Sequence, residues 1–250
     1  MAAMPKSFPD GHRIDWHRHP RAQLLFAIKG TMSIRTPRQL WVVPPLRALW
    51  VPAITPHEVT MSGSVEMRTL YVEPAQARGL APDCVAIEAC PLLRELIVRA
   101  TEMPTLYDDS GADGLVIRLL LDEISRAPVL PLSLPLPDAG ALAGLCAQLL
   151  AEPSGGATLV ECARAAGISS RTLARRFIEE TGLTFGQWRQ RARVQAAIAR
   201  LSDGENITAV ALDLGYESPS AFAAMFRRTM GMPPSALSAR RAGKLAAGPS

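Results

Sequence analysis

The chain has 250 residues, 48% of them hydrophobic and 20% charged, which is enough for two domains of about 100–150 residues. No apolar run approaches the roughly 20 residues that cross a bilayer, so we expect no membrane span. Within the first ten residues no apolar run follows Lys6, so we expect no signal peptide. Four cysteines without C-x-x-C spacing indicate reduced thiols in a cytoplasmic protein rather than a disulfide framework.

The formal net charge of +4 is unevenly divided along the chain. Residues 1–150 hold 14 Lys and Arg against 15 Asp and Glu, whereas residues 151–250 hold 13 against 8. All but one of those thirteen cations are arginines, whose forked guanidinium suits phosphates and guanine edges. The basic excess therefore lies wholly in the last hundred residues, where it favours a nucleic-acid partner or a solvated helical face.

Short β-type runs separated by turn residues predict an all-β N-terminal part. The expected strands are 24–28, 32–34, 40–43 and 68–72. Gly30, Pro52 and Gly63 are among the residues expected to separate them. Many short strands at regular spacing are typical of a β-barrel or sandwich.

Two helices are expected next, at 91–103 and 111–126, because apolar residues recur there at helical spacing. Pro91 suits the first turn of the first helix. The apolar stripe expected in the second helix contains Leu115, Leu119, Leu120 and Ile124. Such a stripe either covers the barrel or forms a dimer seam.

Residues 128–137 contain four prolines in ten positions, so they cannot form a helix and are predicted to link two domains. Everything after this segment has helical periodicity. Asp138 is the expected N-cap of the next helix, which Pro153 to Gly156 should end.

One pattern occurs twice in the helical half. The first copy is Leu159, Ala163, Gly167, Ile168, Leu173, Phe177 and Gly182, and the second is Ile207, Ala211, Gly215, Tyr216, Phe222, Phe226 and Gly231. The small alanine lets two helices approach closely, and the glycine four residues later permits a tight turn with positive φ. The two large apolar residues then pin the second helix to the core, which leaves its opposite face for the major groove.

Having both copies, residues 138–240 resemble the AraC/XylS family of transcription regulators. The most specific stretch is 209–222, followed by Phe226-Arg227-Arg228 and by 231–235. The resemblance implies an all-helical domain with two recognition helices that binds promoter DNA beside RNA polymerase. It also implies an N-terminal domain that senses a small-molecule effector and forms a homodimer. A helix at 186–201 would hold the two units about 34 Å apart, in successive major grooves.

The candidate DNA-binding residues lie at the two second helices and their caps. They are Ser169, Ser170, Arg171, Thr172, Arg175, Arg176, Ser218, Ser220, Arg227 and Arg228. Arg171 and Arg175 are one turn apart and share a face, whereas Ala223 and Ala224 occupy the corresponding face of the second unit. We therefore expect the first unit to read most of the sequence and the second to position the protein on the backbone.

A second constellation lies near the N-terminus, where the spacing of Gly11, His17, His19, Gln23 and Gly30 resembles the first cupin motif. Gln23 stands where metal-binding cupins carry glutamate. A fainter second motif keeps Pro52 and His57. The resemblance, over residues 11–75, implies a barrel.

His17, His19, His57 and Gln23 match the ligand positions of that family and are candidate ligands of a divalent transition metal such as Zn, Ni or Fe. The alternative is that the histidines line a pocket and form hydrogen bonds without metal. The candidate effector-pocket residues are Trp16, Arg21, Gln23, Phe26, Trp41, Arg47 and Trp50. Burial in the core is the alternative for the aromatic members.

Together these patterns predict an α+β protein of two domains. Residues 1–127 form a cupin-like β-barrel with two following helices, 128–137 a Pro-rich linker, and 138–250 an all-α domain with two helix-turn-helix units. The predicted function is sequence-specific transcription regulation in response to a small molecule, without enzymatic activity. A metallo-cupin enzyme and a helical protein-interaction module are the alternatives; metal-dependent turnover would favour the first, and weak, salt-insensitive DNA binding the second.

Overall fold

The structure, a computed structural model, describes residues 1–238. Within them the chain divides into two compact units. The first comprises residues 1–36 and 41–133, and the second comprises residues 37–40 and the chain from Leu134 onward. The domain boundaries 1–127, 128–137 and 138–250 stay a proposal, and residues 239–250 lie outside the described part.

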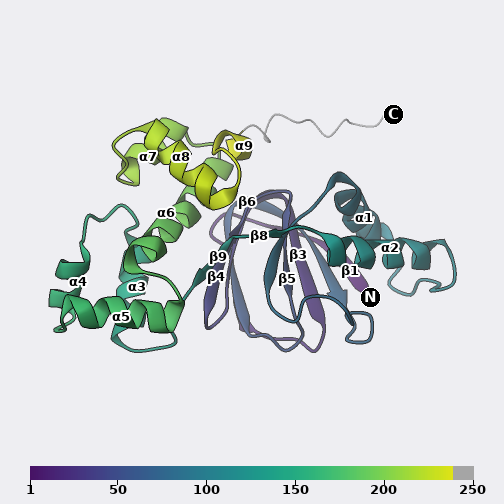
Figure 1. Ribbon diagram of the computed structural model, residues 1–250. Helices are drawn as coiled ribbons and strands as arrows, with labels where there is room; N and C mark the ends of the chain where they lie inside the picture. Colours follow the sequence, from purple (N-terminus) through teal and green to yellow (C-terminus); the bar gives the residue numbers. More distant parts are fainter. Residues whose placement is uncertain (239–250) are drawn as a thin grey trace. The chain divides into compact units, whose positions relative to one another are not determined.

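The first unit is built around a sheet that carries two helices (Figure 1). Its strands are β1 (Ala2–Phe8), β2 (Arg13–His17), β3 (Ala22–Arg35), β4 (Gln39–Val43), β5 (Arg47–Val51), β6 (His57–Val72), β7 (Val85–Glu88) and β8 (Val129–Leu130). The sheet order is β1-β6-β3-β5-β7-β8, with β2 on β6 and β4 on β3. This path has two ends, so the sheet does not close into a barrel, although it is compatible with a cupin-like fold.

Two long strands replace several of the short ones expected. The runs at 24–28 and 32–34 belong to the single strand β3, and Gly30 lies inside it with φ of 73°. The pairing of β3 with β6 shifts register on either side of this glycine, and a Cβ there would lie 2.7 Å from the carbonyl oxygen of Ser64. Gly30 therefore allows a bulge within a strand rather than a turn between strands. The expectation that Gly30 and Gly63 separate strands was wrong for the same reason, since Gly63 lies within β6.

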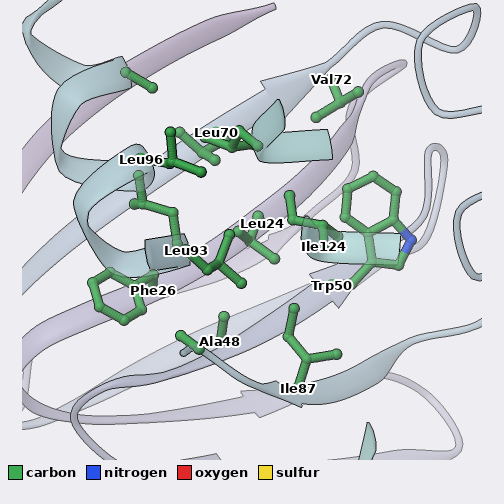
Figure 2. Packing of buried hydrophobic residues seen from close by; sticks show 14 of the residues in the cluster. Leu24, Phe26, Ala48, Trp50, Leu70, Val72, Ile87, Leu93, Leu96 and Ile124 are labelled. Carbon is green, nitrogen blue, oxygen red and sulfur yellow. The ribbon is translucent and has the colours of Figure 1, made fainter. Parts of the chain in front are cut away.

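Helices α1 (Pro91–Glu102) and α2 (Ala112–Arg126) confirm the two helices expected there. They pack on one face of β3, β5 and β6, over Leu24, Phe26 and Trp50 (Figure 2). Each large side chain fully buried in this way stabilises the fold by about 1.5–3 kcal/mol.

The apolar stripe expected in α2 is confirmed for Leu120 and Ile124 and wrong for Leu115 and Leu119. Ile117, Leu120 and Ile124 face the core, whereas Leu115 and Leu119 are 61% and 43% exposed. The sequence offered apolar residues on two sides of this helix, and only the position of the sheet decides which side is buried.

The proline-rich segment forms strands rather than a helix. Val129–Leu130 (β8) pairs with β7, and β9 (Ser133–Pro135) follows. Leu134 and Leu136 are buried in the core of the second unit. The next helix is capped by Gly140 rather than by Asp138, whose carboxylate instead accepts a hydrogen bond from Arg38 at 2.8 Å.

The second unit is helical throughout its described length after β9. Its helices are α3 (Ala141–Ala151), α4 (Leu159–Ala165), α5 (Ser170–Thr181), α6 (Phe185–Ser202), α7 (Ile207–Asp213), α8 (Pro219–Met230) and α9 (Ser235–Ser238). The core contains Phe177 and Trp188, and the Trp188 indole donates to the carbonyl of Pro135 at 2.7 Å.

All four cysteines are free thiols. Burial raises the pKa of Cys84 and Cys146 to about 12. These thiols are therefore protonated at neutral pH and poorly nucleophilic.

Candidate DNA-binding surface and ligand site

The first helix-turn-helix unit consists of α4, a turn at Gly167 and α5. Gly167 has φ of 67°, and a Cβ there would meet nothing within 4 Å, so the backbone conformation alone demands glycine. The hydroxyl of Ser169 caps α5 by accepting from the amide of Thr172 at 3.1 Å. Leu173 and Phe177, on the inner face of α5, are buried. The opposite face of α5 is thereby left to solvent.

The second unit repeats this geometry with α7, a turn at Gly215 and α8. Gly215 has φ of 79°, and the hydroxyl of Ser218 caps α8 by accepting from the amide of Ala221 at 3.2 Å. Phe222 and Phe226 are fully buried. The duplication predicted from the sequence is thus confirmed in the backbone, the caps and the core, and Ser169 and Ser218, rather than Ser170 and Ser220, are the caps.

Helix α6 connects the two units. Its side chains Trp188, Val194, Ile198 and Leu201 are buried, as expected. Gly182 and Gly231, the closing residues of the repeat, have φ of 70° and 71° and end α5 and α8 in the left-handed conformation.

The predicted base-contacting residues of the first unit lie on the exposed face of α5. Arg171 and Arg176 are exposed. Arg175 is also exposed, but its guanidinium pairs with the carboxylate of Glu179 at 2.8 Å. Thr172 is half-buried, with its hydroxyl 2.9 Å from that of Ser169. Sequence reasoning missed Glu179, although its i, i+4 spacing from Arg175 was a readable signal.

The second helix-turn-helix unit presents a different set of side chains. Arg227 and Arg228 are exposed in the last turn of α8, and the hydroxyl of Ser220 lies 3.0 Å from that of Ser218. Ala224 on this helix is also exposed, and it has no polar group with which to read a base edge.

The three motif histidines of the sheet unit converge. His17 on β2 lies opposite His57 on β6 in the strand register, and His19 follows two residues after His17. The ligand nitrogens of the three side chains all lie within 4.8 Å of one another. Three imidazoles at this spacing are typical of a transition-metal site.

The tautomers of these histidines follow from their backbone contacts. The Nδ1 atoms of His17, His19 and His57 lie 2.8, 2.6 and 2.9 Å from carbonyl oxygens of nearby residues. Because a carbonyl only accepts, each Nδ1 must carry the proton, and each neutral ring then keeps its lone pair on Nε2. Contacts that fix the tautomer in this way are the usual second layer of a histidine metal site.

His57 is the most constrained of the three. Its side chain is buried and its Nε2 has no hydrogen-bond partner among the described residues. Burial lowers the pKa of His57 to about 4, against the effect of the Thr55 carbonyl and with a further contribution from His17 and His19. The ring is therefore neutral near pH 7, with a free lone pair directed into the cluster.

Gln23 completes the cluster. Its amide nitrogen donates to the hydroxyls of Thr69 and Tyr71 at 2.7 and 3.2 Å, which turns its oxygen toward Nε2 of His19 at 2.9 Å. This contact is a hydrogen bond when Nε2 of His19 carries a proton, and the same two atoms can share a cation when it does not. These residues fit a divalent transition metal, and sequence reasoning missed Thr69 and Tyr71 because the strand pairing that places them was unknown.

The predicted effector-pocket residues do not gather in one place. Phe26 and Trp50 lie in the core under α1 and α2, and Phe26 lies on the opposite face of β3 from Gln23. The others are Trp41, which is buried, Trp16, which is 45% exposed, Arg47, paired with Glu88, and Arg21, paired with Glu73. Gln23 is the member of this set that contacts the histidines.

The duplicated helix-turn-helix geometry and a sheet domain with a polar interior cluster define a two-domain DNA-binding regulator. Comparison with known proteins agrees. Residues 162–240 match the helix-turn-helix domain family, and residues 8–120 match the AraC-like ligand binding domain. The chain belongs to the AraC family: it is a DNA-binding transcriptional regulator with a ligand-binding N-terminal domain.

Two curated relatives and one solved structure illustrate the similarity. The HTH-type transcriptional regulator NimR of Escherichia coli K12 is 31% identical over 224 residues, which cover 90% of this chain and 82% of NimR. The HTH-type transcriptional regulator RipA of Corynebacterium glutamicum is 35% identical over 114 residues, or 46% of this chain and 34% of RipA. The crystal structure of the DNA-binding domain of AdpA in complex with a target DNA is 32% identical, with a TM-score of 0.38 over 40% of this chain and 92% of that one.

Among the described residues, no helix is both long enough and apolar enough to cross a membrane.

Proposed function

We propose that this regulator senses its effector at the cluster of His17, His19, His57 and Gln23, which holds a divalent transition metal such as Zn, Ni or Fe. The observation that carries the proposal is the convergence of three histidine ring nitrogens, of which Nε2 of His57 is buried and has no hydrogen-bond partner among the described residues. A buried polar atom left unpaired costs about 1–3 kcal/mol, so such an atom is retained where a ligand satisfies it.

The residues of the cluster suit binding of an effector. When bound, the metal supplies a Lewis-acidic contact for an oxygen or nitrogen donor of the effector. Imidazole is not an anionic ligand, and Gln23 replaces the anionic ligand of metal-binding cupins by an amide. The protein therefore contributes no negative charge of its own at these positions, which favours an anionic effector. The cluster serves binding and not turnover.

The remaining parts of the proposal concern assembly. The exposed leucines of α2, Leu115 and Leu119, form the contact of a homodimer, because apolar side chains of this size on an open helix face are stabilised by burial. In the cytoplasm, the dimer binds promoter DNA beside RNA polymerase. The effector regulates transcription only if it binds the two states of the dimer with different affinity.

The experiment measures metal content and affinity of the full chain. We expect about one Zn²⁺ or Ni²⁺ per chain by elemental analysis after dialysis, and at least a tenfold weaker affinity by calorimetry for His19→Gln. The matched control is His12→Gln, because His12 is exposed and stacks on Phe8 away from the cluster. Wild-type protein without metal affinity, or His19→Gln with unchanged affinity, would contradict the metal site.

A second measurement separates sensing from catalysis. Oxygen consumption by the metal-loaded protein should equal that of His19→Gln treated in the same way. Metal-dependent oxygen uptake by the wild type alone would replace the sensor by a metallo-cupin enzyme.

A further inference from the structure

A cavity of about 460 Å³ lies within the helical unit, between α6 and α8. Arg189 and Arg193 reach it from α6, and Arg228 reaches it from α8. Gln190 and Tyr216 contribute further polar groups. Three guanidinium groups from two helices therefore share one hollow, and no Asp or Glu is among the residues that line it.

The partners of these arginines differ from those of Arg200 on the same helix. Arg200, two turns after Arg193 on α6, pairs with both Glu205 and Asp213 at 2.6 Å. Within residues 1–238, by contrast, no ion pair joins Arg189, Arg193 or Arg228 to a carboxylate. Burial, and then the like charge of Arg193, lower the pKa of Arg189. The cavity thus concentrates positive charge that the chain itself leaves uncompensated.

Two of the three arginines are held in place by neutral partners. Arg189 donates to the carbonyls of Gly155 and Ala157, and Nε of Arg193 donates to the carbonyl of Pro153 at 3.1 Å. Carbonyl oxygens fix the orientation of a guanidinium without neutralising it. Each guanidinium has five N–H donors, so donors remain for a further acceptor.

Tyr216 lies beside two of the three charges. The guanidinium carbon of Arg193 lies 5.6 Å from the centroid of its ring. Burial raises the pKa of Tyr216, and the charges of Arg193 and Arg228 oppose that rise, which places both close to its hydroxyl. Anchoring of the loop 153–157 would explain Arg189 and Arg193, but it does not explain the convergence of Arg228 from another helix.

We propose that this cavity is a phosphate-binding site formed by Arg189, Arg193 and Arg228. A tetrahedral oxyanion accepts several N–H donors at once, and arginine forks match its edges. The source of the phosphate is either one backbone phosphate of duplex DNA or a free phosphorylated molecule. The site is separate from the proposed effector site in the sheet unit, so either can fail without the other.

The test uses the full chain and duplexes from the DNA upstream of its own gene. Single backbone phosphates are replaced by neutral methylphosphonates, and affinity is measured by fluorescence anisotropy. At one duplex position we expect the methylphosphonate to weaken DNA binding by the wild type about tenfold or more. The same methylphosphonate should leave the DNA affinity of the Arg228→Gln variant unchanged. Arg227→Gln is the matched control, because it removes the same charge from the neighbouring position on α8 and Arg227 does not line the cavity. DNA binding by this variant should still be weakened by the methylphosphonate at that position. Arg228→Lys should recover part of the sensitivity.

The second arm titrates inorganic phosphate and pyrophosphate into wild type and Arg228→Gln without DNA. Saturable binding to the wild type alone, with no sensitive duplex position, assigns the site to a free phosphorylated ligand. Sensitivity at one duplex position assigns it to the DNA backbone. Arg228 is exposed, and circular dichroism of Arg228→Gln verifies that the variant is folded. If no duplex position distinguishes the variants and neither anion binds, the proposal is wrong.

Discussion

The two helix-turn-helix units share one backbone and differ in the side chains they offer to DNA. Both have a glycine with positive φ in the turn, a serine N-cap and a buried pair of large apolar residues. The exposed face of α5 carries Arg171 and Arg175, whereas α8 has the small Ala224 there and places Arg227 and Arg228 in its last turn. The repeated residues therefore specify the fold of each unit, and we propose that the residues that are not repeated specify its role on DNA.

The largest expected effect tests the shared part. Phe177→Ala and Phe226→Ala should each lower the free energy of unfolding by about 3–5 kcal/mol, since both rings are fully buried and their loss leaves a cavity. Urea denaturation of each variant measures this. If one variant lost less than half as much free energy of unfolding as the other, the cores of the two helix-turn-helix units would not be equivalent.

The next prediction tests the difference between the units. Arg171→Ala should weaken binding to the preferred site by about 1–3 kcal/mol and relax discrimination among base substitutions. Arg228→Ala should weaken binding to all sequences alike and reduce the slope of log K against log salt by about 0.9. Anisotropy titrations over a set of site variants separate the two behaviours, and a uniform loss from Arg171→Ala would refute base reading by the first unit.

A smaller effect is expected at the caps. Ser169→Ala and Ser218→Ala should each cost about 1 kcal/mol of stability, because each leaves a helix N-terminal amide without its acceptor. The neighbours Ser170 and Ser220 supply the controls, since their replacement by alanine should change stability by less than about 0.5 kcal/mol. Thermal unfolding compares the four variants, and equal losses at cap and neighbour would contradict the assignment.

The smallest effect concerns Arg175. Glu179→Gln should remove an exposed i, i+4 ion pair worth about 0.3–0.5 kcal/mol. The freed guanidinium should then bind DNA more tightly, most clearly at low salt. Unchanged affinity across salt concentrations would indicate that Arg175 does not approach the DNA.

How far the sequence predicts this protein differs between its halves. Helix positions in the C-terminal half follow from contacts between residues close in the chain, so the turn glycines and the burial of Leu173 and Phe177 were readable. For each cap the sequence left two nearby serines open, and the structure decides between them. The cap of α3 was not, because Asp138 pairs with Arg38, a hundred residues away. In the sheet half, the sequence predicted the runs 24–28 and 32–34 as separate strands. It did not predict that they form the single strand β3, because the bulge at Gly30 that joins them depends on pairing with β6.

By itself, the sequence determined the two-domain α+β architecture, the duplicated units and the identity of the three histidines, because spacing and residue type are local properties. Only the tertiary structure decided that Thr69 and Tyr71 orient Gln23, that Phe26 and Trp50 lie under helices, and that Arg228 meets Arg189 and Arg193 around one cavity. Each of these depends on which strands pair and which helices cross. Such contacts join residues that are distant in the chain, and no local pattern records them.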